Sequence, residues 1–257
     1  GALSLTGQPE KRDIFAPIVE KIKYVPFGDI SAMSRAVNHK TAMVIVEPIQ
    51  GENGVITPPA GYLRALREIC DANGALLVID AVQTGMGRTG FWFGYEHEEI
   101  TPDVITLAKG LGGGLPLGAM IAIGPAAHLL KPGEHGSTFG GNYLSTVAAL
   151  EVLDILEEMK DNGSLDEHLI YFEQALDTFY RKYPHVFLSH VGLGMMRGLR
   201  VKDGETLSNI IAYALEEGVI VLKAGRNTLR FLPPLTITKE NIDEGFLRLE
   251  RALKKIQ

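Results

Sequence analysis

The sequence predicts an α/β protein: a large domain with a mostly parallel sheet, followed by a smaller α+β domain. Three short apolar runs rich in β-branched residues, 41–47, 75–80 and 103–109, are typical of buried strands. Long crossover segments separate them, which favours parallel pairing. After residue 160 the pattern changes to helices mixed with short strands, so we expect domains over 1–160 and 161–257.

The elements of the large domain are expected in the following order. Residues 1–40 show no strong element, and the first strand stops at Pro48. A helix is predicted over 61–73, because apolar residues recur on one face and Asn73-Gly74 closes it. That face holds Leu63, Leu66, Ile69 and Cys70. The later strands 75–80 and 103–109 are joined by a fourth over 117–123.

Two long helices are predicted over 144–159 and 165–180, and the turn signal Asp161-Asn162-Gly163 between them marks the domain boundary. The first of these helices is expected to turn five apolar residues inward: Val147, Leu150, Leu153, Ile155 and Leu156. The small domain is expected to add strands over 194–201, 219–222 and 228–231, and helices over 206–217 and 239–255.

Composition excludes several classes of protein. The chain has 257 residues, 46% hydrophobic and 22% charged, which is typical of a globular protein. The net charge of −6 argues against nucleic acid as a partner. The single cysteine, Cys70, excludes an intrachain disulfide and fits a reducing compartment, for which we expect the cytoplasm. No apolar run is long enough to cross a membrane, and no His/Cys cluster has metal-site spacing.

Each of the three strongest strands ends in an ionisable residue: Glu47, Asp80 and Lys109. Ligands bind outside the carboxyl ends of strands in open parallel sheets, so these groups are expected to converge on one crevice. Charges at single strand ends often only reach solvent, but three together favour a site. Lys109 lies between an apolar strand and the glycine-rich 110–114, where desolvation makes a lysine nucleophilic. A Schiff base with pyridoxal phosphate would also need an acid at the ring nitrogen, and Asp80 is placed to supply it.

The segment Gly85–Gly90 matches G-x-G-x-x-G after a strand. A dinucleotide site would need a helix to open at these glycines, but the glycine-broken, aromatic segment 91–95 follows. We favour a tight loop with an aromatic packing patch, and a nicotinamide-dependent dehydrogenase stays an alternative. The glycine- and hydroxyl-rich segment 132–142 suits a phosphate. It equally suits an interdomain loop with a helix cap at Asn142. Arg230, inside an apolar strand, either reaches solvent or binds a planar carboxylate; we favour the carboxylate.

Together these residues resemble the class III pyridoxal-phosphate aminotransferases, a fold-type I group with acetylornithine, ornithine and 4-aminobutyrate aminotransferases. The matching segments follow the family order along nearly the whole chain: 46–52, 79–85, 107–110, 136–142 and 229–235. The sequence is most similar in character to acetylornithine aminotransferases and to enzymes acting on carrier-linked lysine or ornithine. The resemblance implies a fold-type I large domain, pyridoxal 5′-phosphate as cofactor and a homodimer with shared active sites.

The resemblance also implies a role for each matching residue. Lys109 is expected to form the Schiff base and move a proton, Asp80 to pair with the pyridine nitrogen, and Gln83 to bond the phenolic oxygen. Ser137 and Thr138 are expected to contact the phosphate, with Thr138 reaching the neighbouring subunit's site.

Arg230 is expected to bind the α-carboxylate of glutamate and 2-oxoglutarate, with Glu52 covering it while the ω-amino substrate is bound. The implied reaction moves the ω-amino group of N-acetylornithine, or of an acyl- or carrier-linked ornithine or lysine, to 2-oxoglutarate in arginine or lysine biosynthesis. The resemblance to enzymes with carrier-linked substrates adds an amino-group carrier protein as a further candidate partner. Ornithine or 4-aminobutyrate aminotransferase and a catalytically incomplete fragment are alternatives.

Two departures from the family pattern accompany the resemblance. Ala81 stands where the family usually has Glu, which removes a charge beside Asp80. Residues 1–4 match what usually follows a further segment carrying a phosphate-cradling helix start and a ring-stacking aromatic. We therefore expect a large domain that is incomplete at its N-terminus.

Overall fold

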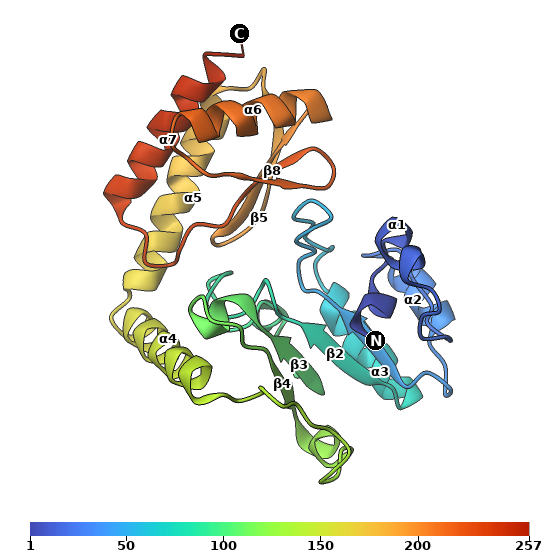
Figure 1. Cartoon of the computed structure of the whole chain (residues 1–257). Coiled ribbons are helices and arrows are strands. Elements are labelled where there is room, and N and C mark those ends of the chain that lie inside the picture. Colours follow the sequence, from blue (N-terminus) through green and yellow to red (C-terminus); the bar gives the residue numbers. More distant parts are fainter. Residues whose placement is uncertain (257) are drawn as a thin grey trace.

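The structure, a computed structural model that describes residues 1–256, has two halves that each contain a four-stranded sheet (Figure 1). The first half contains α1 (Pro9–Arg12), α2 (Ile30–Ala36), β1 (Met43–Val46), α3 (Tyr62–Asn73), β2 (Leu76–Asp80), β3 (Val104–Leu107) and β4 (Ala119–Ala122). Its short 3-10 helices are η1 (Ala2–Leu5), η2 (Asp13–Phe15), η3 (Glu96–Glu98), η4 (Lys109–Gly112) and η5 (Gly124–His128). After the connecting α4 (Tyr143–Asp161) come α5 (Ser164–Lys182), β5 (Phe187–Leu193), β6 (Met196–Val201), α6 (Gly204–Glu216), β7 (Leu222–Ala224), β8 (Thr228–Phe231) and α7 (Lys239–Leu253).

The first sheet has the order β1-β2-β3-β4, and it is mostly parallel as predicted. β1, β2 and β3 run in the same direction, whereas β4 is antiparallel to β3. The register places Val46 beside Ile79 and Asp80 beside Thr106, so the three parallel strands end at one edge. The predicted helix after the first strand is confirmed as α3. It buries Leu63, Leu66 and Cys70 and ends at Gly74, which adopts the left-handed conformation that glycine tolerates.

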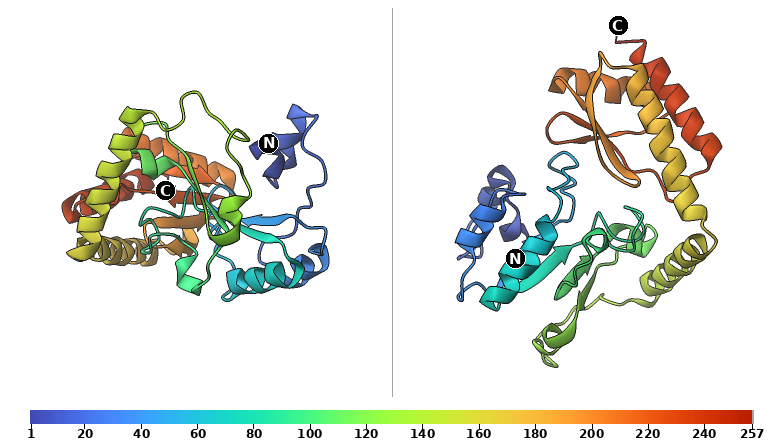
Figure 2. Two further views of the ribbon diagram at one scale, coloured as in Figure 1. Left: turned by 90° about the horizontal axis from the view of Figure 1, so that it is seen from below. Right: turned by 180° about the vertical axis from the view of Figure 1, so that it is seen from behind.

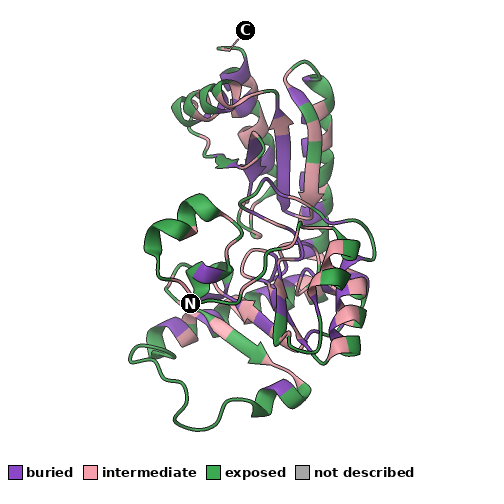
Figure 3. Ribbon diagram, turned by 90° about the vertical axis from the view of Figure 1, so that its right-hand side faces the viewer, coloured by how far each residue is buried: buried purple, intermediate pink, exposed green. Residues whose placement is uncertain are grey.

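The second sheet is antiparallel with the order β5-β6-β8-β7. Side chains alternate between its faces. Leu229 and Phe231 of β8 belong to the core that the sheet shares with the helices α5, α6 and α7. Thr228 and Arg230 therefore point the other way, towards the first half. Of the second sheet, β6 and β8 are mostly buried (Figure 3), and Figure 2 shows the loop between β1 and α3 rising towards this sheet.

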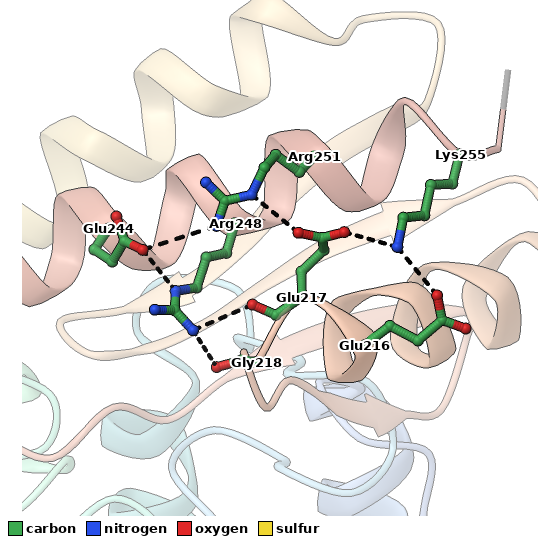
Figure 4. A network of polar contacts seen from close by, with 7 residues as sticks. All are labelled: Glu216, Glu217, Gly218, Glu244, Arg248, Arg251 and Lys255. Atoms are coloured by element: carbon green, nitrogen blue, oxygen red, sulfur yellow. Dashed lines mark hydrogen bonds and ion pairs between the residues drawn. The ribbon is translucent and has the colours of Figure 1, made fainter.

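A surface ion network joins α6 to α7 on the outer side of the second half (Figure 4). Glu217 accepts hydrogen bonds from Arg251 (2.9 Å) and pairs with Lys255 (2.7 Å), while Arg248 bonds the carbonyls of Glu217 and Gly218. The bonds to Lys255 and Arg251 lower the pKa of Glu217. Solvent-exposed pairs of this kind contribute little each, so the apolar core carries most of the packing between these helices.

The predicted inward face of α4 is right for Leu156, which is buried, and for Leu153, which packs half-buried against the first core, but it is wrong for the other three residues. Val147 is 64% exposed, Leu150 60% and Ile155 40%, whereas Ala149 and Leu156 are buried. The helix carries apolar residues on more than one face. The face towards η4 and the first core is covered, and at the C-terminal end Met159 packs into the second core. Periodicity alone does not say which of two apolar faces a neighbour covers.

Two other predictions, both of strands, needed correction, and two elements were not predicted. The predicted strand over 219–222 lies at 222–224, because the amide of Val219 bonds the end of α6 and positive φ angles at Arg226 and Asn227 fix the turn before β8. The strand predicted from residue 194 begins at 196, since Gly194 and Met195 form a hairpin turn after β5. The sequence pattern missed β5 and α2.

Two hydrophobic clusters accompany the two sheets: Leu156 belongs to the first, and Met159 and Leu165 belong to the second. We propose on this support that the domain boundary lies at residues 160–161. Within residues 1–256, no helix has the length and apolar character that crossing a membrane requires.

Candidate active site

The three ionisable strand ends lie within electrostatic reach of one another. The charges of Glu47 and Asp80 both raise the proton affinity of Lys109, as does that of Glu52 from the loop after β1. The parallel register explains this, because β1, β2 and β3 end at the same edge of the sheet. Arg230, from the second sheet, also acts on Lys109. The edge is therefore a cluster of two cations and three acids drawn from both halves.

Lys109 follows β3 in an unusual backbone conformation. Its φ is +50°, a left-handed value that non-glycine residues rarely adopt and that is frequent at functional positions. Desolvation lowers the pKa of the Lys109 amine, and the charge of Arg230 lowers it further, against the opposing effect of the three acids. The result is an amine that loses its proton more readily than a surface lysine.

Asp80 is half-buried, and local contacts orient its carboxylate. Oδ1 accepts a hydrogen bond from the Val82 amide (3.0 Å) and one from the Thr106 hydroxyl (3.4 Å). Within the described part of the chain, no group donates to Oδ2. Ala81, the departure from the family pattern, is 1% exposed inside the apolar core. The orientation of Asp80 thus depends on Val82 and Thr106 rather than on the side chain at position 81.

Glu47 lies at the same edge, and its Oε2 accepts a hydrogen bond from the Gly51 amide (3.2 Å). Burial raises the pKa of the Glu47 carboxyl, and the charge of Asp80 adds to this effect. The resemblance assigned Glu47 no role, although its position at a strand end was visible in the sequence.

The raised pKa of Glu47 predicts a pH-dependent effect on stability. The folded protein binds the Glu47 proton more tightly than the unfolded chain does, so this stabilisation is present at low pH and is lost as pH rises through the folded pKa. Glu47→Gln, which keeps an acceptor for Gly51, should raise the Tm at pH 8 by about 2 °C. The gain should vanish at pH 4. Thermal unfolding at both pH values measures this, and an equal gain at both would contradict it.

Arg230 and Glu52 form an ion pair between the two halves. Arg230 Nη1 lies 2.7 Å from Glu52 Oε1, with the arginine side chain 8% exposed and the glutamate 51%. Nη1 also approaches Gln83 Oε1 (3.4 Å), and Gln83 Nε2 donates to Glu52 Oε1 (3.3 Å). Burial alone would raise the pKa of Glu52, but the hydrogen bond and charge of Arg230 outweigh it and lower the pKa. Arg230 Nε is buried without a partner in the described structure, so the guanidinium keeps a free donor.

Backbone contacts hold this pair in place. The Gly225 amide, in the turn before β8, donates to the Glu52 carbonyl (2.9 Å). A side chain at Gly54 would meet the Gly225 carbonyl, so glycine allows the two loops to touch. The loop that carries Glu52 is therefore attached to the hairpin that carries Arg230.

Gly51 makes room for Gln83, because a Cβ at position 51 would overlap the Gln83 amide. Gly51→Ala should therefore displace that amide from Glu52 and Arg230. Gln83 is the residue expected to bond the phenolic oxygen of pyridoxal phosphate. We therefore expect the Kd for pyridoxal phosphate, measured by absorbance titration, to rise about threefold to tenfold, which is the change in affinity that the loss of one hydrogen bond usually causes. Gly245→Ala, in open space on α7, is the matched control. Equal Kd values for the two variants would contradict this role of Gly51.

Ser137 and Thr138 make no described bond to this cluster. Both are exposed, and among the described residues no bond joins either to Lys109, Asp80 or Arg230. The helix cap expected at Asn142, the alternative interpretation of this loop, is present: Asn142 Oδ1 accepts a hydrogen bond from the Ser145 amide (3.0 Å) and caps α4. A contact of Ser137 or Thr138 with a phosphate stays a prediction.

The glycine motif is not a dinucleotide site. No helix opens at Gly85–Gly90; instead Gly85 bridges back to Phe93, and the Gly87 amide donates to the Trp92 carbonyl (3.4 Å). The glycines close a tight loop, as favoured from the sequence. Nowhere in residues 1–256 do three His, Cys, Asp or Glu side chains lie close enough to hold a metal ion.

Comparison with known proteins gives consistent matches. The family described as "Aminotransferase class-III" matches residues 1–253. The acetylornithine aminotransferase of Streptomyces coelicolor is 47% identical over 249 residues, which are 96% of this chain and 60% of that protein. The acetylornithine aminotransferase of Caldanaerobacter subterraneus is 44% identical over 260 residues, covering 100% of this chain and 65% of that protein.

Two solved structures share the fold. The ornithine aminotransferase from Toxoplasma gondii superposes with a TM-score of 0.91 at 31% identity, covering 99% of this chain and 61% of that one. The N-acetylornithine aminotransferase from Stenotrophomonas maltophilia gives 0.81 at 34% identity, covering 91% and 62%. The chain spans about three fifths of the length of these proteins. Because the family match extends from the first residue to residue 253, this chain belongs to the class-III aminotransferase family.

Proposed function

We propose that the intact protein is a pyridoxal-phosphate-dependent aminotransferase that moves the ω-amino group of N-acetylornithine to 2-oxoglutarate. The observation that carries the proposal is the convergence of Lys109, Asp80 and the Arg230–Glu52 pair at one sheet edge. The acetylornithine aminotransferases among the relatives support this donor. Ornithine, 4-aminobutyrate and acyl- or carrier-linked ornithine or lysine are the alternative donors, and a catalytically incomplete fragment is the alternative to an enzyme.

The donor set of the site fits pyridoxal phosphate. Lys109 offers a primary amine with a lowered pKa, and Asp80 offers a carboxylate oxygen without a described donor. Gln83 adds an amide at the same edge. Amine, carboxylate and amide are the groups that suit the aldehyde, the ring nitrogen and the phenolic oxygen.

When bound, pyridoxal phosphate supplies an electron sink for the carbon that loses its proton. Lys109 would hold the cofactor through Nζ, and after substrate displaces it, the free amine would carry the proton between the two reacting carbons. The Asp80 carboxylate would keep the ring nitrogen protonated, and the hydrogen bonds from Val82 and Thr106 would orient that carboxylate. Gln83 would orient the ring from the side of Glu52.

Arg230 and Glu52 would select between the two unlike substrates. A guanidinium binds a carboxylate bidentately, so Arg230 suits the α-carboxylate of glutamate or 2-oxoglutarate. The ω-amino donor has no carboxylate there, and a buried arginine left unpaired costs several kcal/mol by order of magnitude. Glu52, 51% exposed, is free enough to cover Arg230 for one substrate and to leave for the other.

We also propose a homodimer in which Ser137 and Thr138 serve the partner subunit's phosphate. The apolar side chains around this loop support a second copy as the occupant, since Phe139 is 83% exposed, Tyr143 91% and Leu144 71%. Sedimentation of the intact, active protein tests this, and a fully active monomer would overturn it. An amino-group carrier protein remains a candidate partner, and the buried free thiol of Cys70 supports the cytoplasm as location.

The deciding experiment is a titration of the intact protein with pyridoxal phosphate, followed by borohydride reduction and peptide mapping. A visible absorbance band and a pyridoxyl group on Lys109 are the expected results. Activity is then compared with N-acetylornithine, ornithine and 4-aminobutyrate as donors. A label on another lysine with none on Lys109 would end the proposal.

A further inference from the structure

The Gly85–Gly90 loop makes a packing contact between the two halves of the molecule. It leaves the first sheet after β2 and packs on the second half. A side chain at Gly87 would meet Leu165 and Leu235, and one at Gly90 would meet Leu169. The function proposed above uses none of these residues.

Arg88 is the charged member of this loop. Its Nη1 donates to the carbonyls of Met195 (3.4 Å) and Pro233, and its own carbonyl accepts from the Met195 amide (3.0 Å). A side chain at Gly194 would overlap the backbone of Arg88 and Thr89, so the hairpin turn between β5 and β6 fits closely on the loop.

The charge of Arg88 has no carboxylate to offset it. No Asp or Glu of residues 1–256 pairs with Arg88, and desolvation lowers its pKa to about 10. A partly buried, uncompensated guanidinium costs folding free energy. A charge that costs stability and is held by several bonds at one junction points to a function of that junction.

The two carbonyls that Arg88 binds belong to the segments beside Arg230. Pro233 follows Arg230 by three residues at the exit of β8, and Met195 immediately precedes β6, whose Gly198 pairs with Arg230 in register. Arg88 itself follows Asp80 and Gln83 by a few residues. One side chain therefore ties the strand that carries the carboxylate-binding arginine to the strand that carries Asp80.

We propose that Arg88 is a positioning residue that sets the distance between Arg230 and the Lys109–Asp80 edge, and thereby the affinity for dicarboxylates. This rests on the proposed function in taking Arg230 as the carboxylate site. A hydrogen bond to a charged group contributes on the order of 10- to 100-fold in affinity, so loosening this contact and misaligning Arg230 should weaken dicarboxylate binding without touching the cofactor.

The test measures binding rather than turnover. Glutarate is a dicarboxylate that lacks the reacting keto group, and its Kd is measured by calorimetry on the intact protein loaded with pyridoxal phosphate. Arg88→Lys keeps the charge but loses the guanidinium, and Arg88→Met loses both. Both should raise the Kd for glutarate about tenfold or more, while pyridoxyl labelling of Lys109 stays at the wild-type level.

A local readout comes from hydrogen exchange of the Met195 amide, which bonds the backbone carbonyl of residue 88. Both variants keep that carbonyl but lose the guanidinium bonds to Met195 and Pro233 that hold the loop in place, so the exchange should accelerate about tenfold. Gly194→Ala, which disturbs the same contact with Arg88 intact, should act in the same direction if Arg88→Met does not fold. Arg251→Met, in the outer network of Figure 4, is the control and should change neither value.

Two results would overturn the inference. One is a glutarate Kd within twofold of wild type in Arg88→Lys. The other is an equal loss of glutarate and cofactor affinity, which would show a general structural role. A wild-type protein without transaminase activity would refute the proposed function instead. The hydrogen-exchange rate and the Kd for glutarate would still show whether Arg88 positions Arg230.

Discussion

Lys109→Ala should lower the turnover of the intact protein by roughly 10³-fold or more, because one side chain supplies both the attachment point and the moving proton. The turnover of Lys109→Arg should fall by a similar factor. A guanidinium keeps its proton and cannot act as the nucleophile, although it preserves the positive charge among Glu47, Glu52 and Asp80. The measurement is the single-turnover rate of amino transfer from glutamate, followed by cofactor absorbance.

A small amine offers a sharper version of this experiment. Methylamine added to Lys109→Ala occupies the space of the missing amine, and about tenfold recovery is expected from proton transfer alone. Lys109→Arg, in which that space is filled, should not recover. Lys202→Ala removes a lysine that is 71% exposed and only loosely paired with Asp203, and should match wild type. Activity of Lys109→Ala within tenfold of wild type would remove Lys109 from the reaction.

Arg230→Lys should raise the KM for 2-oxoglutarate about 10- to 100-fold. A lysine ammonium cannot make the two parallel hydrogen bonds that a guanidinium makes to a carboxylate, and hydrogen bonds to charged groups contribute roughly 1.5–3 kcal/mol each. The half-reaction with the ω-amino donor should change far less. This asymmetry follows from the structure, where Arg230 is buried and its Nε has no partner in the described chain.

Glu52→Ala should act in the opposite sense. With Glu52 gone, Arg230 is permanently open, and we expect the preference to shift about tenfold towards glutamate-like α-amino donors. Glu52→Gln keeps a neutral acceptor for Arg230 and Gln83 and should lie between wild type and alanine. Single-turnover rates of both half-reactions decide the point. If Glu52→Ala slowed them equally, Glu52 would have a structural role and no part in selection.

The sequence by itself determined the elements whose signals are local. The buried strands before Glu47, Asp80 and Lys109 are continuous apolar runs, and a parallel arrangement brings their ends to one edge without further information. Arg230 was recognisable because a charge inside an apolar strand is unusual. The resemblance to the family added roles that spacing alone does not carry.

Only the tertiary structure decided which distant segments meet. The Arg230–Glu52 pair joins residues 178 apart in sequence, and Arg88 meets a hairpin turn and the exit of β8 through bonds to backbone carbonyls, which any residue offers. Similarly, α4 has apolar residues on more than one face, and its neighbours determine which face is buried. Local periodicity records how a segment folds, but contacts between loops depend on shape and hydrogen-bond geometry that form only when the two halves pack together.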